Sequence, residues 1–328
     1  MQRNLRGRTK PGRGVCALVV LTMSLGLAAC GSDKEKATEA GGTTTVKVGV
    51  IPIVDVAPIY LGIKQGFFEE EGLELKLETA QGGAAIVPGV MSDQYQFGFS
   101  NTVSLLLGGS KGLGLQAVAA GVSSTGEKGK DFGGVVVKGD SAIKSAADLA
   151  GKKIAVNTLQ NINTITVNEA VRAAGGDPSG IEYVELAFPD IAPAVAKGDV
   201  DAGQLVEPFL TIAQGQGDRQ VTSNYAETDP GLLVGAYFTS DTYAKRNPKA
   251  VTAFGAAMKK SMAYATEHPD DVRAILTEYT DIAADVQKNA VLPSWPTEIE
   301  TGSLQKLADL MAEDGLADSA PDVKSLLP

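Results

Sequence analysis

Val46-Lys-Val-Gly-Val-Ile-Pro-Ile53 decides the fold, because it is typical of a buried strand that runs into a loop bent by proline. A short apolar helix is expected next, over residues 57–65, and Gly66 ends it. Residues 73–78 (Leu-Glu-Leu-Lys-Leu-Glu) alternate between apolar and charged side chains, which predicts a half-exposed strand. The order strand, helix, strand predicts parallel pairing in an open α/β sheet.

The alternation of strands and helices continues along the chain and restarts once. Further strands are expected over 96–100, 115–120, 134–138, 153–156, 181–186 and 200–206. Helices are expected over 82–91, 104–107, 163–174 and 191–196, and then over 249–266, 270–280 and 301–313. The C-terminal part is therefore mostly helical, and we expect it to pack back on the first half of the chain.

Two segments echo each other, one in each half. Residues 92–101 and 198–207 both read as a helix end, a tight turn with Asp, a strand and a polar residue, Asn101 or Glu207. Ligands in open α/β sheets bind beyond the carboxyl ends of strands, so these two residues are expected on opposite walls of one cleft. The alternative is that both are ordinary loop residues that cap helices.

The N-terminus has the features of an export signal. Five basic residues precede a 13-residue apolar run, residues 15–27, which is shorter than the roughly 20 residues that a membrane-spanning helix needs. Leu27-Ala28-Ala29-Cys30 resembles the bacterial lipobox, which implies removal of residues 1–29 and lipidation of Cys30. The alternative is an ordinary cleavage site beside a chance cysteine. Residues 30–45 are expected to be a flexible tether, because the stretch from Gly31 to Thr45 carries no large apolar residue.

Composition excludes several classes of function. Removing residues 1–29 takes away five of the 29 basic residues and none of the 39 acidic ones, so the net charge changes from −10 to −15. That balance argues against nucleic-acid binding. Cys16 and Cys30 are the only cysteines, and His268 is the only histidine, so a Cys/His zinc site or a Ser-His-Asp triad has no residues to use. We therefore expect no catalytic residues, no metal and no cofactor.

Seven short motifs, in order, resemble those of periplasmic-type substrate-binding proteins of the NMT1/THI5-like family (nitrate, sulfonate, taurine and thiamine-pyrimidine binders). They occupy residues 57–62, 66–73, 82–85, 97–101, 148–153, 198–202 and 207–209, within a resemblance that covers roughly 46–270. The resemblance implies a type II binding-protein fold of two α/β lobes around a cleft, with crossover strands placed near 134–138 and 235–239. Lobe 1 would comprise 46–135 and 236–328, and lobe 2 would comprise 136–235.

The ligand is inferred from the charged and polar side chains expected in the cleft. The helix after Gly82-Gly83 has no arginine, whereas Asp55 and Glu207 are carboxylates that suit a ligand with NH donors or positive charge. Asp55 could instead cap the helix that follows it. Phe97 and Phe99 are expected in the core, and Tyr60 is the candidate for stacking on the ligand. The expected ligand-binding set is Asp55, Tyr60, Gly82, Gly83, Asn101, Thr102, Ser123, Asn157, Thr158, Asn161 and Glu207.

The amide-rich stretch from Asn157 to Asn163 follows a strand and opens a helix. Amide side chains donate and accept hydrogen bonds, which suits a neutral polar ligand, although they also cap helices. The sequence thus predicts a monomeric, extracytoplasmic receptor, anchored to the membrane at Cys30. It would deliver a small nitrogen-containing organic solute to the permease and ATPase of an ABC importer. The alternatives are a binder of sulfonate- or nitrate-type anions, an enzyme acting on a thiamine-pyrimidine precursor, and a surface sensor or adhesion lipoprotein.

Overall fold

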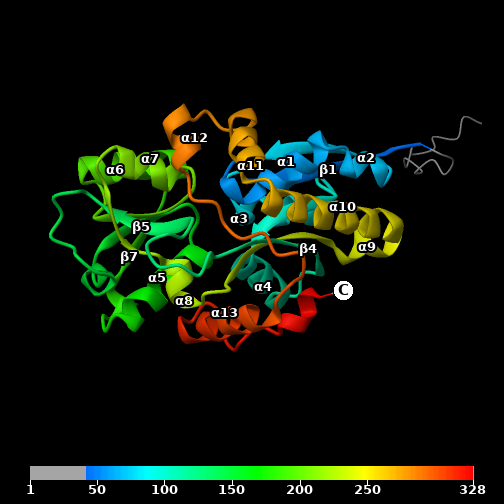
Figure 1. Cartoon of the computed structure of the whole chain (residues 1–328). Helices are drawn as coiled ribbons and strands as arrows, with labels where there is room; N and C mark the ends of the chain where they lie inside the picture. The colour runs from blue at the N-terminus through cyan, green and yellow to red at the C-terminus, as the bar shows by residue number, and fades with distance from the viewer. Residues whose placement is uncertain (1–41, 328) are drawn as a thin grey trace, which may run out of the picture. The chain divides into compact units, whose positions relative to one another are not determined.

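The computed structural model of the protein describes residues 42–327, in which two five-stranded mixed sheets are each flanked by helices (Figure 1). Cys30 and the rest of the predicted signal lie outside the described residues. Within the described range, none of the helices combines the length and the apolarity that crossing a bilayer requires.

The first sheet has the strand order β2-β1-β3-β10-β4. Its strands are β1 (Thr44–Val50), β2 (Leu73–Thr79), β3 (Phe97–Asn101), β4 (Leu115–Ser123) and β10 (Leu233–Ser240). β1 pairs in parallel with β2 and β3, as the sequence pattern predicts, and β10 runs antiparallel to β3 and β4. Val46, Val48 and Val50 of β1 are buried while Lys47 is exposed, so the strand presents its valine face to the core.

The second sheet repeats this plan with the order β7-β6-β8-β5-β9. Its strands are β5 (Gly133–Val137), β6 (Lys153–Val156), β7 (Glu182–Glu185), β8 (Ala202–Val206) and β9 (Arg219–Thr222). β6 is parallel to β7 and β8, and β5 is antiparallel to β8 and β9. The short edge strand β9 has no counterpart among the predicted strands.

Each sheet is covered by helices from the neighbouring parts of the chain. Beside the first sheet are α1 (Ala57–Lys64), α2 (Phe67–Glu70), α3 (Gly83–Met91), α4 (Thr102–Ser110), α9 (Asp241–Arg246), α10 (Pro248–Glu267) and α11 (Pro269–Ile275). Beside the second are α5 (Ile162–Ala173), α6 (Phe188–Lys197), α7 (Phe209–Gly215) and α8 (Asn224–Thr228). Two more follow, α12 (Ala284–Asn289) and α13 (Thr301–Glu313). Short 3-10 turns include η1 (Val54–Val56), η4 (Leu276–Glu278) and η5 (Val323–Leu326).

The chain passes between the sheets in two connecting segments, residues 124–132 and 223–232. The expected crossings near 134–138 and 235–239 instead fall inside β5 and β10, each of which belongs to one sheet only. Asp131 joins the two connections: its Oδ2 accepts from Ser124 Oγ at 2.7 Å and from the Ala226 N–H at 3.0 Å. Its Oδ1 accepts from the Thr125 N–H at 3.0 Å.

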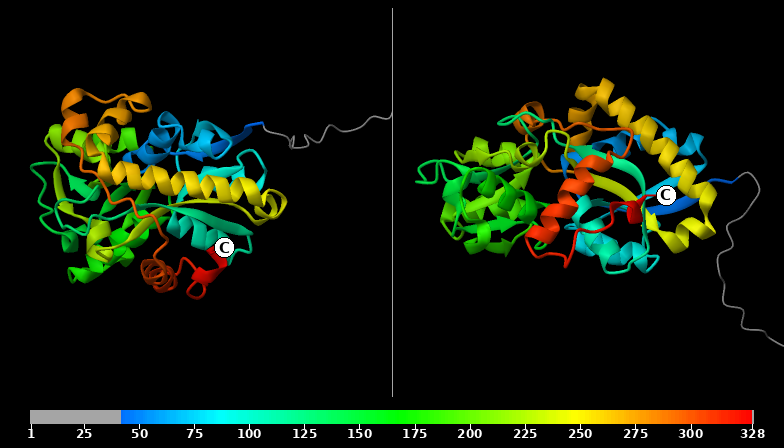
Figure 2. Two further views of the ribbon diagram at one scale, coloured as in Figure 1. Left: turned by 45° about the vertical axis from the view of Figure 1, so that its right-hand side comes forward. Right: turned by 90° about the horizontal axis from the view of Figure 1, so that it is seen from below.

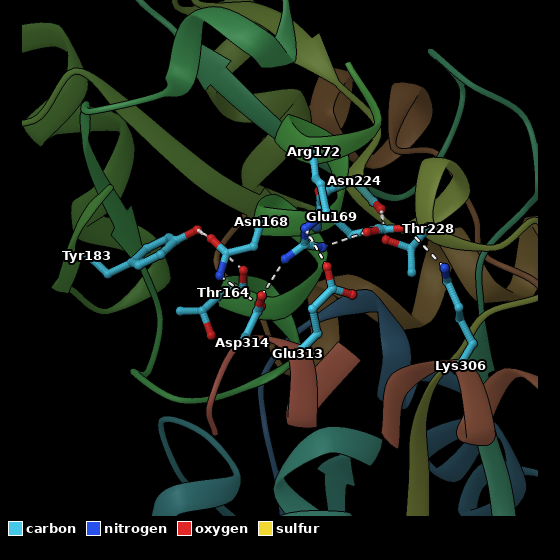
Figure 3. Close-up of polar contacts among 10 residues, drawn as sticks. All are labelled: Thr164, Asn168, Glu169, Arg172, Tyr183, Asn224, Thr228, Lys306, Glu313 and Asp314. Atoms are coloured by element: carbon cyan, nitrogen blue, oxygen red, sulfur yellow. Dashed lines mark hydrogen bonds and ion pairs between the residues drawn. The ribbon is translucent and has the colours of Figure 1, made fainter. Parts of the chain in front are cut away.

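The C-terminal segment contacts both sheets' helices, rather than the first half alone as the sequence suggests. The Leu233 N–H donates to Ser303 Oγ at 3.1 Å, and α13 packs against both α4 and α5, as Figure 2 shows. Ion pairs hold α13 to α5 (Figure 3): Arg172 contacts the carboxylates of Glu313 and Asp314, at 2.9 and 2.5 Å. A second pair joins Lys306 to Glu169 of α5 at 3.0 Å.

Candidate functional site

A small cavity of about 30 Å³ lies between the two sheets. One wall comes from the first sheet's side and contributes Ile51, Ile53, Asp55, Phe99, Asn101 and Val234. The other wall comes from the second sheet's side and contributes Asn157, Asn161, Ile162, Asn163, Phe188, Val206 and Tyr225. Most of these residues follow or end the parallel strands β1, β3, β6 and β8, the position at which open α/β sheets bind ligands.

Asp55 is the charged residue of this cavity. Its side chain is 2% exposed, and its Oδ1 atom has no hydrogen-bond partner. Burial raises the pKa of Asp55 to about 7, and the nearby Asp131 carboxylate adds to the rise in pKa. No side-chain cap is formed at the start of η1 or α1, so the helix-capping alternative for Asp55 is not realised.

The amides of the second wall bond mainly to one another. Asn161 caps α5, since its Oδ1 accepts from the Asn163 and Thr164 N–H groups, and its Nδ2 donates to Asn157 Oδ1 at 2.9 Å. Asn163 Nδ2 donates to the same oxygen at 2.8 Å, and Tyr225 donates its hydroxyl to Asn163 Oδ1 at 2.5 Å. Capping and cavity lining are therefore combined in one network.

Asn101 has both of the roles considered for it. Its Oδ1 accepts from the Ser104 N–H at 2.9 Å, which caps α4, and also from the Ile162 N–H at 3.4 Å on the opposite wall. The two walls are thus in direct contact. A second such contact joins the Val54 N–H to the Glu207 carbonyl at 3.0 Å.

Gly82 permits close approach of the two walls, Gly83 permits close packing of α3 on β3 and α4, and neither glycine lines the cavity. A Cβ atom on Gly82 would lie 2.9 Å from Thr158 Cγ2 and 3.2 Å from Asn157 Nδ2, both on the facing wall. A Cβ on Gly83 would lie 2.2 Å from Ser100 Oγ. Gln81 and Asn157 exchange long hydrogen bonds of 3.4 and 3.5 Å beside this contact.

Glu207 is placed differently from the sequence expectation. Its Oε1 accepts from Thr211 Oγ1 at 2.8 Å and from the Val291 N–H at 3.0 Å, and its Oε2 accepts from the Thr211 N–H. Burial raises the pKa of this carboxyl, while those hydrogen bonds and Arg273 oppose the rise. The carboxylate does not line the cavity, because it is bonded to α7 and to the C-terminal segment.

Four further expected residues also lie outside the cavity lining. The ring of Tyr60 stacks on that of Tyr279 with centroids 4.1 Å apart. Thr102 donates its hydroxyl to the Leu233 carbonyl at 2.8 Å, and Ser123 pairs through its backbone with Ser294. Thr158 Oγ1 accepts from Asn161 Nδ2 at 2.7 Å, so it supports a lining residue from behind.

Nine of the thirteen lining residues are missing from the expected set, and three of them are Phe99, Asn163 and Tyr225. The sequence places Phe99 in the core, and its side chain, from the middle of β3, borders both the core and the cavity. Asn163 belongs to the amide-rich stretch, which was its available signal. Tyr225 lies on the short helix α8 within the second connection, and no motif in the sequence marks it.

A larger hollow of about 300 Å³ adjoins the cavity and shares Ile51, Ile53 and Phe188 with it. Its remaining lining residues are Pro52, Thr79, Ala80, Gln81, Ala187, Pro189 and Phe209. Phe188 and Phe209 lie nearly parallel, with centroids 5.8 Å apart and an angle of 12°. We call the two spaces the inner cavity and the outer hollow, and together the cleft.

The cleft contains one charged residue, Asp55, among the lining residues of both spaces, and no Lys, Arg or His. Across residues 42–327, no cluster of three or more Asp, Glu, His or Cys is arranged to hold a metal ion. The cleft can therefore accept hydrogen bonds at a carboxylate and at amides, and can pack apolar groups against Phe188 and Phe209.

Known proteins resemble this chain along most of its length. The family model described as NMT1/THI5 like matches residues 53–272. A protein of Bacillus subtilis whose name assigns it to aliphatic sulfonate binding is 22% identical over 322 residues, covering 94% of this chain and 93% of its own. The formylaminopyrimidine-binding protein of Halalkalibacterium halodurans is 23% identical over 271 residues, covering 80% and 78%.

A solved structure agrees with the predicted fold class. The periplasmic aliphatic sulphonate binding protein of Escherichia coli superposes with a TM-score of 0.71 at 18% identity, covering 88% of this chain and 92% of that one. The described residues thus have the two-lobe α/β fold of periplasmic binding proteins.

Proposed function

Because this chain belongs to the NMT1/THI5-like family, we propose that it is the solute-binding receptor of an ABC importer. The two sheets with their helices are the two lobes, and the cleft between them holds the solute. The solute is a small nitrogen-containing organic molecule, neutral or cationic. The residues that bind it are Asp55, Asn101, Asn157 and Asn161, joined by Phe99, Asn163 and Tyr225.

Asp55 is the observation that supports this solute most strongly. A buried carboxylate with an unpartnered oxygen is costly unless a hydrogen-bond donor or a positive charge approaches it. An N–H group of the solute would satisfy that oxygen. An anion would instead meet an acidic residue with no cation among the residues that line the cleft.

The receptor is proposed to work outside the cytoplasm, held by lipid at Cys30, with the permease and ATPase of the importer as partners. The support is the Leu27-Ala-Ala-Cys30 signature and the tether that follows it. The test is mass spectrometry of the mature wild type and of Cys30→Ser. A lipid mass on the N-terminal cysteine of the wild type, absent from the variant, is expected, and lipid-free wild type would refute the anchor.

Two other roles within the family are less well supported. An enzyme acting on a pyrimidine precursor would need a nucleophile as well as an acid–base group in the cleft, and Asp55 is accompanied there by no Cys, Lys or His among the lining residues. His268 lies elsewhere, with its ring stacked on Tyr264 at 3.9 Å. A sulfonate or nitrate binder would be expected to place donors or cations opposite the anion. The Asp55 carboxylate would repel either a sulfonate or a nitrate anion.

Calorimetry with the mature protein separates these roles. Aminopyrimidines and small amines are titrated beside taurine, an alkanesulfonate and nitrate. We expect an amine to bind and Asp55→Asn to weaken it by about tenfold to a hundredfold, as for a lost charge-assisted hydrogen bond. Asp199→Asn, at an exposed carboxylate outside the cleft, is the matched control and should leave affinity unchanged.

The opposite pattern would refute the proposal. If an anion binds with micromolar affinity while no amine binds, Asp55 does not select the solute. If Asp55→Asn and Asp199→Asn both leave amine affinity unchanged, the amine binds outside the cleft.

A further inference from the structure

The cleft has two spaces of very different size and chemistry, and this difference constrains the solute further. The inner cavity is lined by a carboxylate and four asparagines together with apolar residues, whereas the outer hollow is mainly apolar and aromatic. We propose that the solute is a primary amine with a compact apolar body, its ammonium group in the inner cavity and its body in the outer hollow. This inference rests on the proposed function, since it specifies the solute of the same cleft.

The inner cavity has room for only a small polar group. Its volume of about 30 Å³ is a few times the roughly 10–15 Å³ that one water molecule requires, so it admits one or two water-sized groups such as an ammonium group. An ammonium group has three N–H donors, and the cavity offers it the unpartnered Oδ1 of Asp55. The side-chain oxygens of the four asparagines already accept hydrogen bonds from within the protein, so the amides surround the ammonium group as polar neighbours. A ring or a carboxylate does not fit this space while the walls remain in contact.

The outer hollow is where the remainder of the solute fits. Its 300 Å³ accommodate on the order of ten non-hydrogen atoms, at about 30 Å³ each. Phe188 and Phe209 lie nearly parallel beside Pro52 and Pro189, so an aliphatic or aromatic body would bury apolar surface there. Thr79 and Gln81 are the polar side chains of this lining.

The two spaces are neighbours that one molecule can occupy together. Ile51 and Ile53 from one wall and Phe188 from the other border both spaces. These three side chains form the partition between them and come from facing lobes, so separation of the lobes parts them. A solute that enters an open cleft therefore meets the carboxylate and the apolar hollow at once. When the cleft closes, Ile51, Ile53 and Phe188 pack around the part of the solute that joins its ammonium group to its apolar body.

A series of straight-chain primary amines, from methylamine to dodecylamine, tests the proposal by calorimetry on the mature protein. We expect affinity to rise about fourfold for each added methylene, the value for burial of one CH₂ group, and to level off near ten carbons. The matching straight-chain alcohols lack the ammonium group and should bind far more weakly at each length.

Two variants locate the apolar body. Phe209→Ala should reduce the gain for each methylene, while Phe67→Ala, a half-buried phenylalanine that begins α2 outside the cleft, should preserve it. Ala80→Leu fills part of the hollow with three further carbons, so affinity should level off about three carbons earlier. Circular dichroism of each variant verifies that it is folded.

The outcomes distinguish this inference from the function on which it rests. If amines bind through Asp55 but affinity is independent of chain length, the proposed function stands and the amphipathic solute is refuted. If Phe209→Ala and Phe67→Ala change the gain for each methylene equally, the body lies outside the hollow, which also refutes it. If no amine binds and an anion does, the proposed function itself fails.

Discussion

Replacing Asp55 by Asn should stabilise the protein while weakening its solute binding, and the gain in stability should depend on pH. The carboxyl has a pKa of about 7 in the folded protein, against 3.8 for an unburied Asp. Because the pKa is raised on folding, the carboxyl favours folding at low pH. That contribution is fully present below about pH 4 and is lost as the pH rises through about 7.

The magnitude follows from the shift in pKa. Each unit corresponds to about 1.4 kcal/mol, so ionised Asp55 opposes folding by about 4 kcal/mol at pH 8 when no positive group accompanies it. Asparagine has nearly the same shape and cannot ionise. The variant should therefore exceed the wild type in free energy of unfolding by about 4 kcal/mol at pH 8 and by only about 1–2 kcal/mol at pH 5.

Opening of the cleft can reduce the difference in unfolding free energy between the variant and the wild type below about 4 kcal/mol. An open cleft lets water reach Asp55, so part of the 4 kcal/mol appears as opening of the lobes rather than as unfolding. The same energy would change the ratio of closed to open molecules by up to about a thousandfold. A solution scattering measurement should then show the wild type expanding between pH 5 and pH 8 while Asp55→Asn stays compact.

Urea unfolding of both proteins at pH 5, 6, 7 and 8 measures the difference in stability directly. Asp199→Asn, at an exposed carboxylate, is measured beside them to remove the effect of losing one negative charge. A stability difference that is constant from pH 5 to pH 8, together with scattering profiles that do not change, would refute the reasoning. Asp55 would then be hydrated in the folded protein.

Three further substitutions test separate parts of the structure. Glu207→Ala should lower the free energy of unfolding by about 2 kcal/mol or more, because it leaves the N–H groups of Thr211 and Val291 without their partner. Calorimetry should show that the solute affinity is unchanged, and a large loss of affinity would mean that Glu207 belongs to the binding site. Gly82→Ala should weaken solute binding, because the added methyl group prevents the two walls from meeting and costs the closed form about 1–3 kcal/mol. Gly302→Ala, which has open space around it, should leave solute affinity unchanged; equal affinities of the two variants would contradict the contact between Gly82 and the facing wall. Arg172→Leu should lower the free energy of unfolding in urea by about 2 kcal/mol, a value between those for exposed and for buried ion pairs. Lys64→Ala, which removes an exposed ion pair, is the control. If Arg172→Leu costs no more than Lys64→Ala, α13 is held by packing alone.

The sequence predicts those parts of the fold that local patterns determine. Alternating valines mark β1, and alternating leucines mark β2, because one face of each strand is buried. The edge strand β9 has four residues of mixed burial, so no period can be recognised in it. The short helix α8 is likewise too brief to show a helical pattern.

The candidate site was predictable to the extent that backbone position determines it. Asp55, Asn101 and Asn157 follow strands, and a residue after a strand lies at the cleft edge whatever its side chain does. Glu207 has the same backbone position, but its carboxylate turns to an N–H group that is 84 residues away in the chain. A contact of that kind depends on the folded C-terminal segment, for which the local sequence has no signal.

Asp131 has a consequence for how occupancy is signalled. Its two oxygens accept hydrogen bonds from both connections, through Ser124 and Thr125 on one and Ala226 on the other. The connections are thereby pinned to one point, so they bend together, and sliding or twisting of one sheet against the other would break bonds to a buried carboxylate. We therefore expect bending about this point to be easier than sliding or twisting between the sheets. In the proposed receptor, a partner that contacts helices of both sheets would then sense one angle, without contact with the solute itself.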